Sequence, residues 1–248
     1  MSRLSGWAAR ARPGPAREPE PPILASLRRD TVIAAVAAVL TAAAFIAAAD
    51  SGVLAHIQRL DDSWMRLMIS GRTAPVTAVA KVFNVLGLVY VTLPVRVAVL
   101  GYLGYRRRWW RLAAFGSAVL VSEILIGLLK GVYDRARPPG SLVATSGASF
   151  PSGHSIAASV TVLAMVIVLV SPGRHRVAWA VGAVTFAVMM ALSRAYLGAH
   201  WLSDAIAGLL LGTSCALLAA VAVDQVQRWR TRPAAPAAAR SVPSGDRL

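Results

Sequence analysis

Residues 203–223 read SDAIAGLLLGTSCALLAAVAV, an apolar run in which Asp204 is the one charged residue. A helix of this length measures about 30 Å, which matches the hydrocarbon thickness of a bilayer. Five further apolar runs of similar length precede it in the chain. They cover residues 31–50, 83–104, 112–131, 153–171 and 177–195. The pattern predicts an all-α, polytopic membrane protein with six transmembrane helices.

The overall composition agrees with this fold class. The chain has 248 residues, of which 56% are hydrophobic and 15% charged, and its mean hydropathy is +0.59. Soluble domains carry more charge and less apolar surface than this. We expect one membrane domain over residues 31–229. Residues 1–30 and 230–248 are rich in Pro, Arg and Ala without apolar periodicity, which predicts two disordered cytoplasmic tails.

The formal net charge of +15 indicates membrane topology and not a nucleic-acid partner. The cations gather in the tails and in short connections between apolar runs, and they do not line one amphipathic face. With six crossings, all of these clusters fall on one side, which the positive-inside rule makes cytoplasmic. We expect a cell-membrane protein with both termini cytoplasmic. The clusters outside the N-terminal tail are Arg106, Arg107, Arg108, Arg111, Arg174, Arg176, Arg228, Arg230 and Arg232.

The segment from Val53 to Ile69 is amphipathic at helical spacing, with Asp61, Asp62 and Arg66 between apolar residues. This pattern is typical of a helix that lies in the outer membrane interface, between the first and second spans. A passive anchor is the interpretation we favour, and a guide for lipid entry is the alternative.

Two cations stand at the end of the third apolar run. Lys130 and Arg137 are seven residues apart, so they share a helix face if the helix continues to Pro138 and Pro139. The positive-inside rule does not explain cations on the outer side. Snorkelling of both side chains to the interface is the alternative explanation.

The sequence Pro151-Ser152-Gly153-His154 directly precedes the fourth apolar run. Ser152 is placed as an N-cap, and Gly153 lets a ligand approach the backbone. The free N–H groups of a helix start favour an anion, beside which His154 would stand. A capping or interfacial histidine is the structural alternative.

Arg194, His200 and Asp204 lie where the fifth run ends and the sixth begins. His200 and Asp204 are four residues apart, so on a helix the carboxylate accepts a hydrogen bond from one imidazole nitrogen and leaves the other free to attack. A buried structural pair is the alternative for these two residues. Because all three segments face outward by the topology argument, we interpret them as one site for a polyanion.

These residues resemble the three signature motifs of the type-2 phosphatidic acid phosphatase superfamily. Lys130 with Arg137-Pro138, then Pro151 to His154, then Ser193-Arg194 with His200 and Asp204, match in order and spacing. The resemblance implies a membrane lipid phosphatase in which His200 forms a phosphohistidine, Asp204 orients it and His154 protonates the leaving group. It implies that the phosphate-binding residues are Lys130, Arg137, Ser152, Gly153 and Arg194. No metal or other cofactor is implied.

Other polar residues receive structural interpretations. Arg96 and Glu123 lie inside the second and third apolar runs at compatible depths, so we predict an ion pair between those helices. Asp134 and Arg135 are interpreted as solvated rim residues, and Trp201 as an interfacial anchor.

Several functions remain open at the level of sequence. His154, His200 and Asp204 could form a metal site, although three nearby cations disfavour a divalent ion. A membrane transporter or lipid-binding scaffold is the non-enzymatic alternative, and a phosphotransferase would share the phosphohistidine. The expected partners are the bilayer and a lipid phosphate substrate. The candidate substrates implied by the resemblance are phosphatidic acid, phosphatidylglycerol phosphate and polyprenyl diphosphate.

Overall fold

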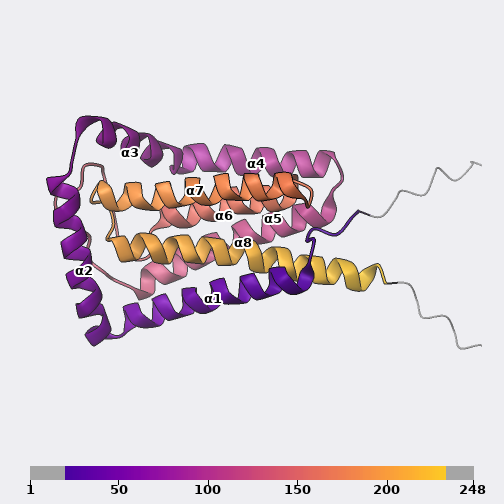
Figure 1. Cartoon of the computed structure of the whole chain (residues 1–248), viewed down its shortest axis with the longest axis horizontal. Coiled ribbons are helices and arrows are strands. Elements are labelled where there is room, and N and C mark those ends of the chain that lie inside the picture. Colours follow the sequence, from indigo (N-terminus) through magenta and orange to yellow (C-terminus); the bar gives the residue numbers. More distant parts are fainter. Residues whose placement is uncertain (1–19, 233–248) are drawn as a thin grey trace, which may run out of the picture.

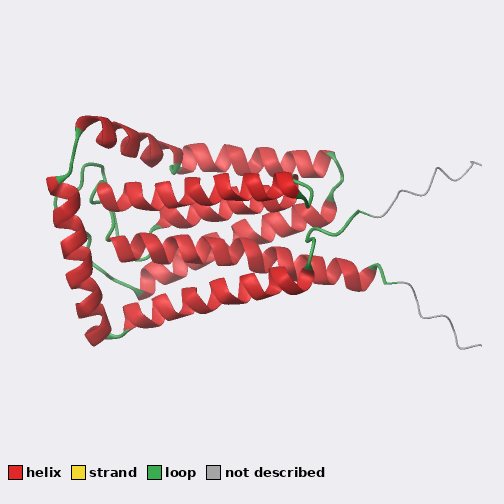
Figure 2. Ribbon diagram, in the orientation of Figure 1, coloured by secondary structure: helices red, strands yellow, loops and turns green. Residues whose placement is uncertain are grey.

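The computed structural model describes residues 20–232, which form eight α-helices and no strand within that range (Figures 1 and 2). The all-α prediction is confirmed for these residues. Most of the two predicted tails, residues 1–19 and 233–248, lies outside the described part of the chain. The helices are α1 (Leu27–Ala49), α2 (Ser51–Ser70), α3 (Ala74–Leu86), α4 (Val89–Tyr105), α5 (Trp109–Val132), α6 (Gly153–Leu169), α7 (Arg174–Tyr196) and α8 (Leu202–Arg230).

Residues 20–30 fall within the predicted N-terminal tail, and they include the start of α1. Ser26 caps α1 by accepting a hydrogen bond from the backbone N–H of Arg29 at 3.4 Å. Ile23 is fully buried, and its N–H donates to Asp224 Oδ1 at 2.7 Å. The apolar pattern did not reveal this order because its partner, Asp224, lies about 200 residues away in the chain.

The long helices run side by side along one axis, and α2 lies across one end of this bundle (Figure 1). Helix α8 packs against α1, α5, α6 and α7. Both described ends of the chain lie at the end of the bundle opposite α2 (Figure 1). One end of the bundle is therefore crossed by α2, and the other carries the two described chain ends.

Helices α6 and α8 approach closely because two glycines of α8 face α6. A Cβ on Gly212 would lie 2.5 Å from the Ile156 carbonyl oxygen, and one on Gly208 would lie 2.6 Å from the Ser152 carbonyl oxygen. Small residues four apart allow such close packing between membrane helices. The first turn of α8 is thereby held against the N-terminus of α6, where the backbone N–H of Ser152 donates to the carbonyl of Asp204 at 3.1 Å.

The single helix predicted over residues 83–104 is wrong. The chain forms two helices there, α3 and α4, bent by 51° at the break between Leu86 and Val89. Gly87 at this break packs against the ring of His154, so a side chain at this position would overlap it. The apolar run hid the break because hydrophobicity does not change across it.

The six predicted spans are confirmed only in part. Four helices, α1, α5, α7 and α8, are long and apolar enough to cross a membrane, and the bent pair α3–α4 would be a fifth span. Helix α6 is apolar but has 17 residues. It is also the helix whose side chains are largely enclosed by α5, α7 and α8. The described residues thus contain four or five spans by length and composition.

The helix predicted over residues 53–69 is present as α2. Its Asp61 and Met65 are buried against the bundle, with 3% and 6% of their surface exposed, whereas Leu60 and Leu67 are exposed. A passive anchor does not account for a buried carboxylate. The position of α2 in the membrane interface stays a prediction.

The predicted ion pair between Arg96 and Glu123 is confirmed. The Nη1 of Arg96, on α4, lies 2.5 Å from Glu123 Oε1, on α5. The Nε of the same arginine donates to Thr161 Oγ1 on α6 at 2.9 Å. One guanidinium thus connects three helices, which offsets the cost of holding its charge in an apolar region.

Candidate functional site

The candidate site is a cavity of about 330 Å³ at the α2 end of the bundle. Three cations and two imidazoles line it, each from a different one of five segments: α5, the α5–α6 connection, α6, α7 and the α7–α8 connection. No carboxylate of residues 20–232 lines it. The lining residues are Lys130, Arg137, Ala144, Thr145, Ser146, Gly153, His154, Arg194 and His200. The structure therefore brings together six of the eight predicted site residues, with Ser152 and Asp204 buried outside the lining.

Ser152 caps α6, as predicted. Its hydroxyl accepts hydrogen bonds from the Ser155 N–H at 3.5 Å and from the Ser155 hydroxyl at 3.1 Å. Because this side chain is fully buried, its role here is to shape the helix start. Gly153, the first residue of α6, lines the cavity. The free N–H groups of this helix terminus make it an anion-binding position.

Lys130 and Arg137 reach the same cavity, but not from one helix face as predicted. Helix α5 ends at Val132, and Arg137 lies in the connection that follows. The Arg137 guanidinium donates to the carbonyls of Ser146, Gly147, Ala148 and Ala199, at 2.6 to 3.1 Å. Backbone carbonyls, and not helix geometry, therefore aim this side chain.

Arg194 lies in the last turn of α7 and is 3% exposed. Its Nη1 hydrogen-bonds Oδ1 of Asn84, in the last turn of α3, while its Nε has no protein partner among residues 20–232. Sequence reasoning missed Asn84, whose signal was one amide within an apolar run. Near the α3–α4 break, Asn84 therefore bonds Arg194, and Gly87 packs against the ring of His154.

His200 is buried, but the helical pairing predicted for it with Asp204 is wrong. His200 precedes α8, which begins at Leu202. Its Nδ1 lies 2.7 Å from the Ser149 carbonyl and 3.7 Å from Asp204 Oδ2, so the carbonyl and not the carboxylate accepts the hydrogen bond. The other ring nitrogen, Nε2, accepts a hydrogen bond from Arg137 Nη1 at 3.2 Å. This geometry places the proton on Nδ1 and the lone pair on Nε2, beside Arg137, which also lines the cavity.

Asp204 is fully buried behind His200. Its Oδ2 accepts from the Ser149 hydroxyl at 2.5 Å and from the Trp201 N–H at 2.9 Å. Its Oδ1 accepts from Arg135 at 2.6 Å. Asp204 therefore holds Ser149, which in turn holds His200.

Two residues set aside on sequence grounds belong to this surrounding layer. Arg135 was predicted to be a solvated rim residue, yet its side chain is 10% exposed and pairs with two carboxylates. Trp201 was predicted to be an interfacial anchor, yet it is 9% exposed and its indole N–H donates to the Ala136 carbonyl at 2.9 Å. Hydropathy did not predict either role because both depend on distant partners.

His154 occupies the second position of α6 and lines the cavity. Its Nε2 is buried and has no hydrogen-bond partner among the described residues. The ring lies against Gly87 at the α3–α4 break. His154 therefore has a free ring nitrogen beside the three cations.

The site favours a neutral imidazole and a bound anion. Burial lowers the pKa of His200 below its ordinary value of 6.5; the nearby Asp204 opposes this shift, and the charges of Arg137 and Arg194 add to it. Burial also lowers the pKa of Arg137. A phosphate group in the cavity would compensate the three cations that line it.

The alternative metal site is not assembled. Among residues 20–232, no three His, Cys, Asp or Glu side chains converge in a way that could hold a metal ion. Both oxygens of Asp204 instead accept hydrogen bonds, from Ser149, Trp201 and Arg135. The geometry instead leaves two imidazoles and three cations around one cavity.

Comparison with known families and proteins gives consistent matches. The family model of the PAP2 superfamily matches residues 111–228. Phosphatidylglycerophosphatase B of Bacillus subtilis (strain 168) is 32% identical over 140 residues, which are 53% of this chain and 67% of that protein. Lipid A 1-phosphatase of Rhizobium etli is 34% identical over 123 residues. The chain spans about half the length of that second relative.

Two solved structures share the fold. One is the crystal structure of the first transmembrane PAP2 type phosphatidylglycerolphosphate phosphatase from Bacillus subtilis, with 29% identity and a TM-score of 0.60. That match covers 74% of this chain and 93% of the other. The other is the crystal structure of Aquifex aeolicus LpxE, with 22% identity and a TM-score of 0.54. That match covers 64% of this chain and 94% of the other, and it supports the fold alone.

Proposed function

The chain belongs to the PAP2 superfamily of membrane lipid phosphatases, and we propose that it hydrolyses the terminal phosphate of a lipid without a metal ion. One observation carries this proposal: three cations and two imidazoles surround the cavity, and no carboxylate in the described part of the chain lines it. Such a lining suits a phosphate dianion and disfavours a divalent cation.

In the proposed reaction, His200 Nε2 attacks phosphorus while the bond from phosphorus to the lipid oxygen breaks. The carbonyl of Ser149, whose hydroxyl donates to Asp204, keeps the Nδ1 proton in place and stabilises the imidazolium that forms. His154 protonates the departing alkoxide. The negative charge of the bound phosphate favours the protonated form of His154 that this step needs.

Lys130, Arg137, Arg194 and the Gly153 N–H are proposed to hold the nonbridging oxygens as charge spreads in the transition state. Ser152 contributes by capping the helix that presents Gly153. Water, deprotonated by His154, then attacks the phosphohistidine. This second step releases inorganic phosphate and restores neutral His200.

The proposed substrate is a glycerophospholipid phosphate monoester, with phosphatidylglycerol phosphate first. The relative with 67% of its length matched is named phosphatidylglycerophosphatase B, which supports this order. Phosphatidic acid shares the reacting group and is second. Polyprenyl diphosphate is third, because it places a second charged phosphate in a cavity of about 330 Å³.

The proposed membrane placement has six crossings: α1, the bent pair α3–α4, α5, α6, α7 and α8. Helix α6 is about 26 Å long, and its enclosure by α5, α7 and α8 supports including it. The arginines near the α4–α5 connection and the start of α7 share the bundle end with the described chain ends (Figure 1). That end is proposed to be cytoplasmic and the site extracytoplasmic.

Phosphate release from a panel of lipid phosphates by purified protein, with chelator present, tests this function. We expect activity on phosphatidylglycerol phosphate that vanadate inhibits, because vanadate bound to a histidine mimics the transferring phosphoryl group. Asp204→Asn and His200→Ala should both lose activity. Full activity in His200→Ala would overturn the mechanism, and loss of activity with chelator, restored by a metal, would overturn metal independence.

A further inference from the structure

A buried charge cluster joins helix α2 to the residues behind the proposed nucleophile. Arg135 lies between two carboxylates: its Nη2 is 2.7 Å from Asp61 Oδ2, on α2, and its Nη1 is 2.6 Å from Asp204 Oδ1, on α8. Asp61 is 3% exposed and Asp204 is fully buried. One guanidinium thus compensates the charge of two buried carboxylates.

The same cluster is tied together by neutral groups. Asp61 accepts from the Ser203 N–H at 2.9 Å and from the Ser203 hydroxyl at 2.5 Å. Gln58, one turn before Asp61, accepts from Arg135 Nη2 at 2.6 Å. Helix α2 therefore bonds to the first turn of α8 both directly and through the guanidinium.

Arg135 also reaches His200 through its own backbone. Its carbonyl accepts from the Ser149 N–H at 2.8 Å, and the Ser149 carbonyl accepts from His200 Nδ1 at 2.7 Å. The Ser149 hydroxyl donates to Asp204. The described hydrogen bond of His200 Nδ1 is thus to Ser149. Arg135 holds Ser149 in two ways: its carbonyl accepts from the Ser149 N–H, and its guanidinium bonds Asp204, which accepts from the Ser149 hydroxyl.

We propose that Arg135 and Asp61 are positioning residues for the reaction, through which the docking of α2 sets the orientation and charge of the Asp204–Ser149–His200 unit. The proposal rests on the function proposed above, because it assigns the two residues an effect on the nucleophile. It gives α2 a part in turnover beyond lipid contact. An arginine suits this place because its planar fork can bond two carboxylates at once, which a lysine cannot match.

The cluster should affect the charge balance around His200. The groups that face His200 are Arg137 from the α5–α6 connection, Arg194 from α7, His154 from α6 and Asp204 from α8, with Lys130 of α5 across the cavity. Removing the Arg135 cation leaves Asp204 less compensated and favours imidazolium. Removing the Asp61 anion should favour neutral imidazole instead, because Asp204 is then the one carboxylate paired with Arg135 and its charge is better compensated.

The test compares full-length Asp61→Asn, Arg135→Gln and Arg135→Lys with Asp62→Asn in detergent micelles, using a short-chain phosphatidic acid. Asp62 is the matched control because it is the adjacent carboxylate of α2 and accepts a bond only from Gln58 among the described residues. We expect kcat to fall about 10-fold in Asp61→Asn and about 100-fold in Arg135→Gln, with KM within about twofold. Arg135→Lys should recover part of the loss, and Asp62→Asn should match the wild type.

The pH profile separates positioning from simple structural support. The acidic limb of kcat/KM should move to higher pH in Arg135→Gln and to lower pH in Asp61→Asn, by about half a unit each. Equal kcat in Asp61→Asn and Asp62→Asn would overturn the proposal, as would losses with no pH displacement. If Arg135→Gln does not fold, the kcat and pH profiles of Asp61→Asn and Arg135→Lys test the proposal. Wild-type phosphate release no greater than that of His200→Ala would instead refute the proposed function.

Discussion

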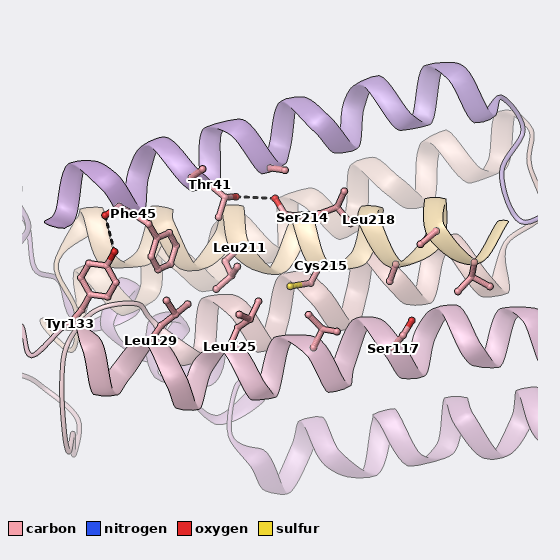
Figure 3. A pocket seen from close by; sticks show the side chains of 16 residues that line it. Thr41, Phe45, Ser117, Leu125, Leu129, Tyr133, Leu211, Ser214, Cys215 and Leu218 are labelled. Carbon is pink, nitrogen blue, oxygen red and sulfur yellow. Dashed lines mark hydrogen bonds between the residues drawn. The ribbon is translucent and has the colours of Figure 1, made fainter. Parts of the chain in front are cut away.

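Two cavities lie on different faces of helix α5, and they differ in size and in lining. The candidate site, on the Lys130 face, has a volume of about 330 Å³ and a lining of cations and imidazoles. The other, between α1, α5 and α8, has about 660 Å³ and 16 lining residues, none of them charged (Figure 3). Its polar groups satisfy one another: Thr41 bonds Ser214 at 2.9 Å, and the Tyr133 hydroxyl donates to the Phe45 carbonyl at 2.9 Å.

The comparison teaches that volume does not identify a reaction site in this bundle. The larger cavity offers a ligand only apolar contact, because its hydroxyls are engaged with protein partners. The smaller one leaves Nε2 of His154 and Nε of Arg194 without protein partners among the described residues. Buried polar groups without partners are costly, so their presence marks the place where a ligand completes the bonding.

Removing one side chain from each cavity should give the largest contrast. His200→Ala removes the proposed nucleophile, and we expect kcat to fall by at least about 10³-fold. Cys215→Ala removes a buried side chain from the apolar cavity, and its activity should stay within about twofold of the wild type. Phosphate release by the purified variants measures both. Comparable losses of activity in the two variants would contradict the assignment of the reaction to the smaller cavity.

The cations of the smaller cavity come next in expected effect. Arg194→Gln removes a buried guanidinium aimed at the cavity, and kcat/KM should fall by about 10²-fold. Inhibition by vanadate should weaken as well, because the anion loses a cationic partner. Inhibition curves on the variant and the wild type test this. An unchanged inhibition constant would show that Arg194 does not contact the anion.

The α3–α4 break offers a test of the cavity wall. A Cβ at Gly87 would overlap the His154 ring, so we expect Gly87→Ala to displace the proposed acid and lower kcat by about tenfold. Gly101, on α4, is the matched control, since a Cβ there meets nothing within 4 Å. Activity assays and thermal unfolding of both variants distinguish displacement from misfolding. An equal and small effect of both substitutions would contradict the packing argument.

A smaller effect concerns pH. The attack requires neutral His200, and burial lowers its pKa below 6.5. The neutral form, and with it the activity, is present above this lowered pKa and is lost as the pH falls through it. We therefore expect the midpoint of the acidic limb of kcat/KM below pH 6.5. A midpoint above that value would indicate that Asp204 outweighs burial and the two arginines.

The smallest effect on activity is expected in the larger cavity. Thr41→Val removes the bond to Ser214 and should cost about 0.6 kcal/mol of stability, the average for hydrogen bonds between membrane helices. The kcat should not change, because this cavity takes no part in the proposed reaction. Thermal unfolding of Thr41→Val, Ser214→Ala and the double variant gives the coupling between the two residues. A loss of activity without a loss of stability would show that the larger cavity does take part in the reaction.

The sequence predicted the components of the site better than their arrangement. Lys130, Arg137, Gly153, His154, Arg194 and His200 line one cavity, as the three motifs indicated. Two inferences from helical spacing were wrong, because α5 ends before Arg137 and α8 begins after His200. Spacing predicts contacts only while a helix continues, and these residues lie at helix ends, where tertiary contacts set the backbone.

The sequence by itself determined the long apolar helices apart from the α3–α4 break, the helix start at Ser152 and six of the nine residues that line the site. Apolar length and capping are local properties. Only the tertiary structure decided the partners of the buried polar groups. Arg194 meets Asn84 across 110 positions of the chain, and Asp61 meets Ser203 across 142. A buried charge must find its partner wherever the fold supplies one, and no local pattern records that distance.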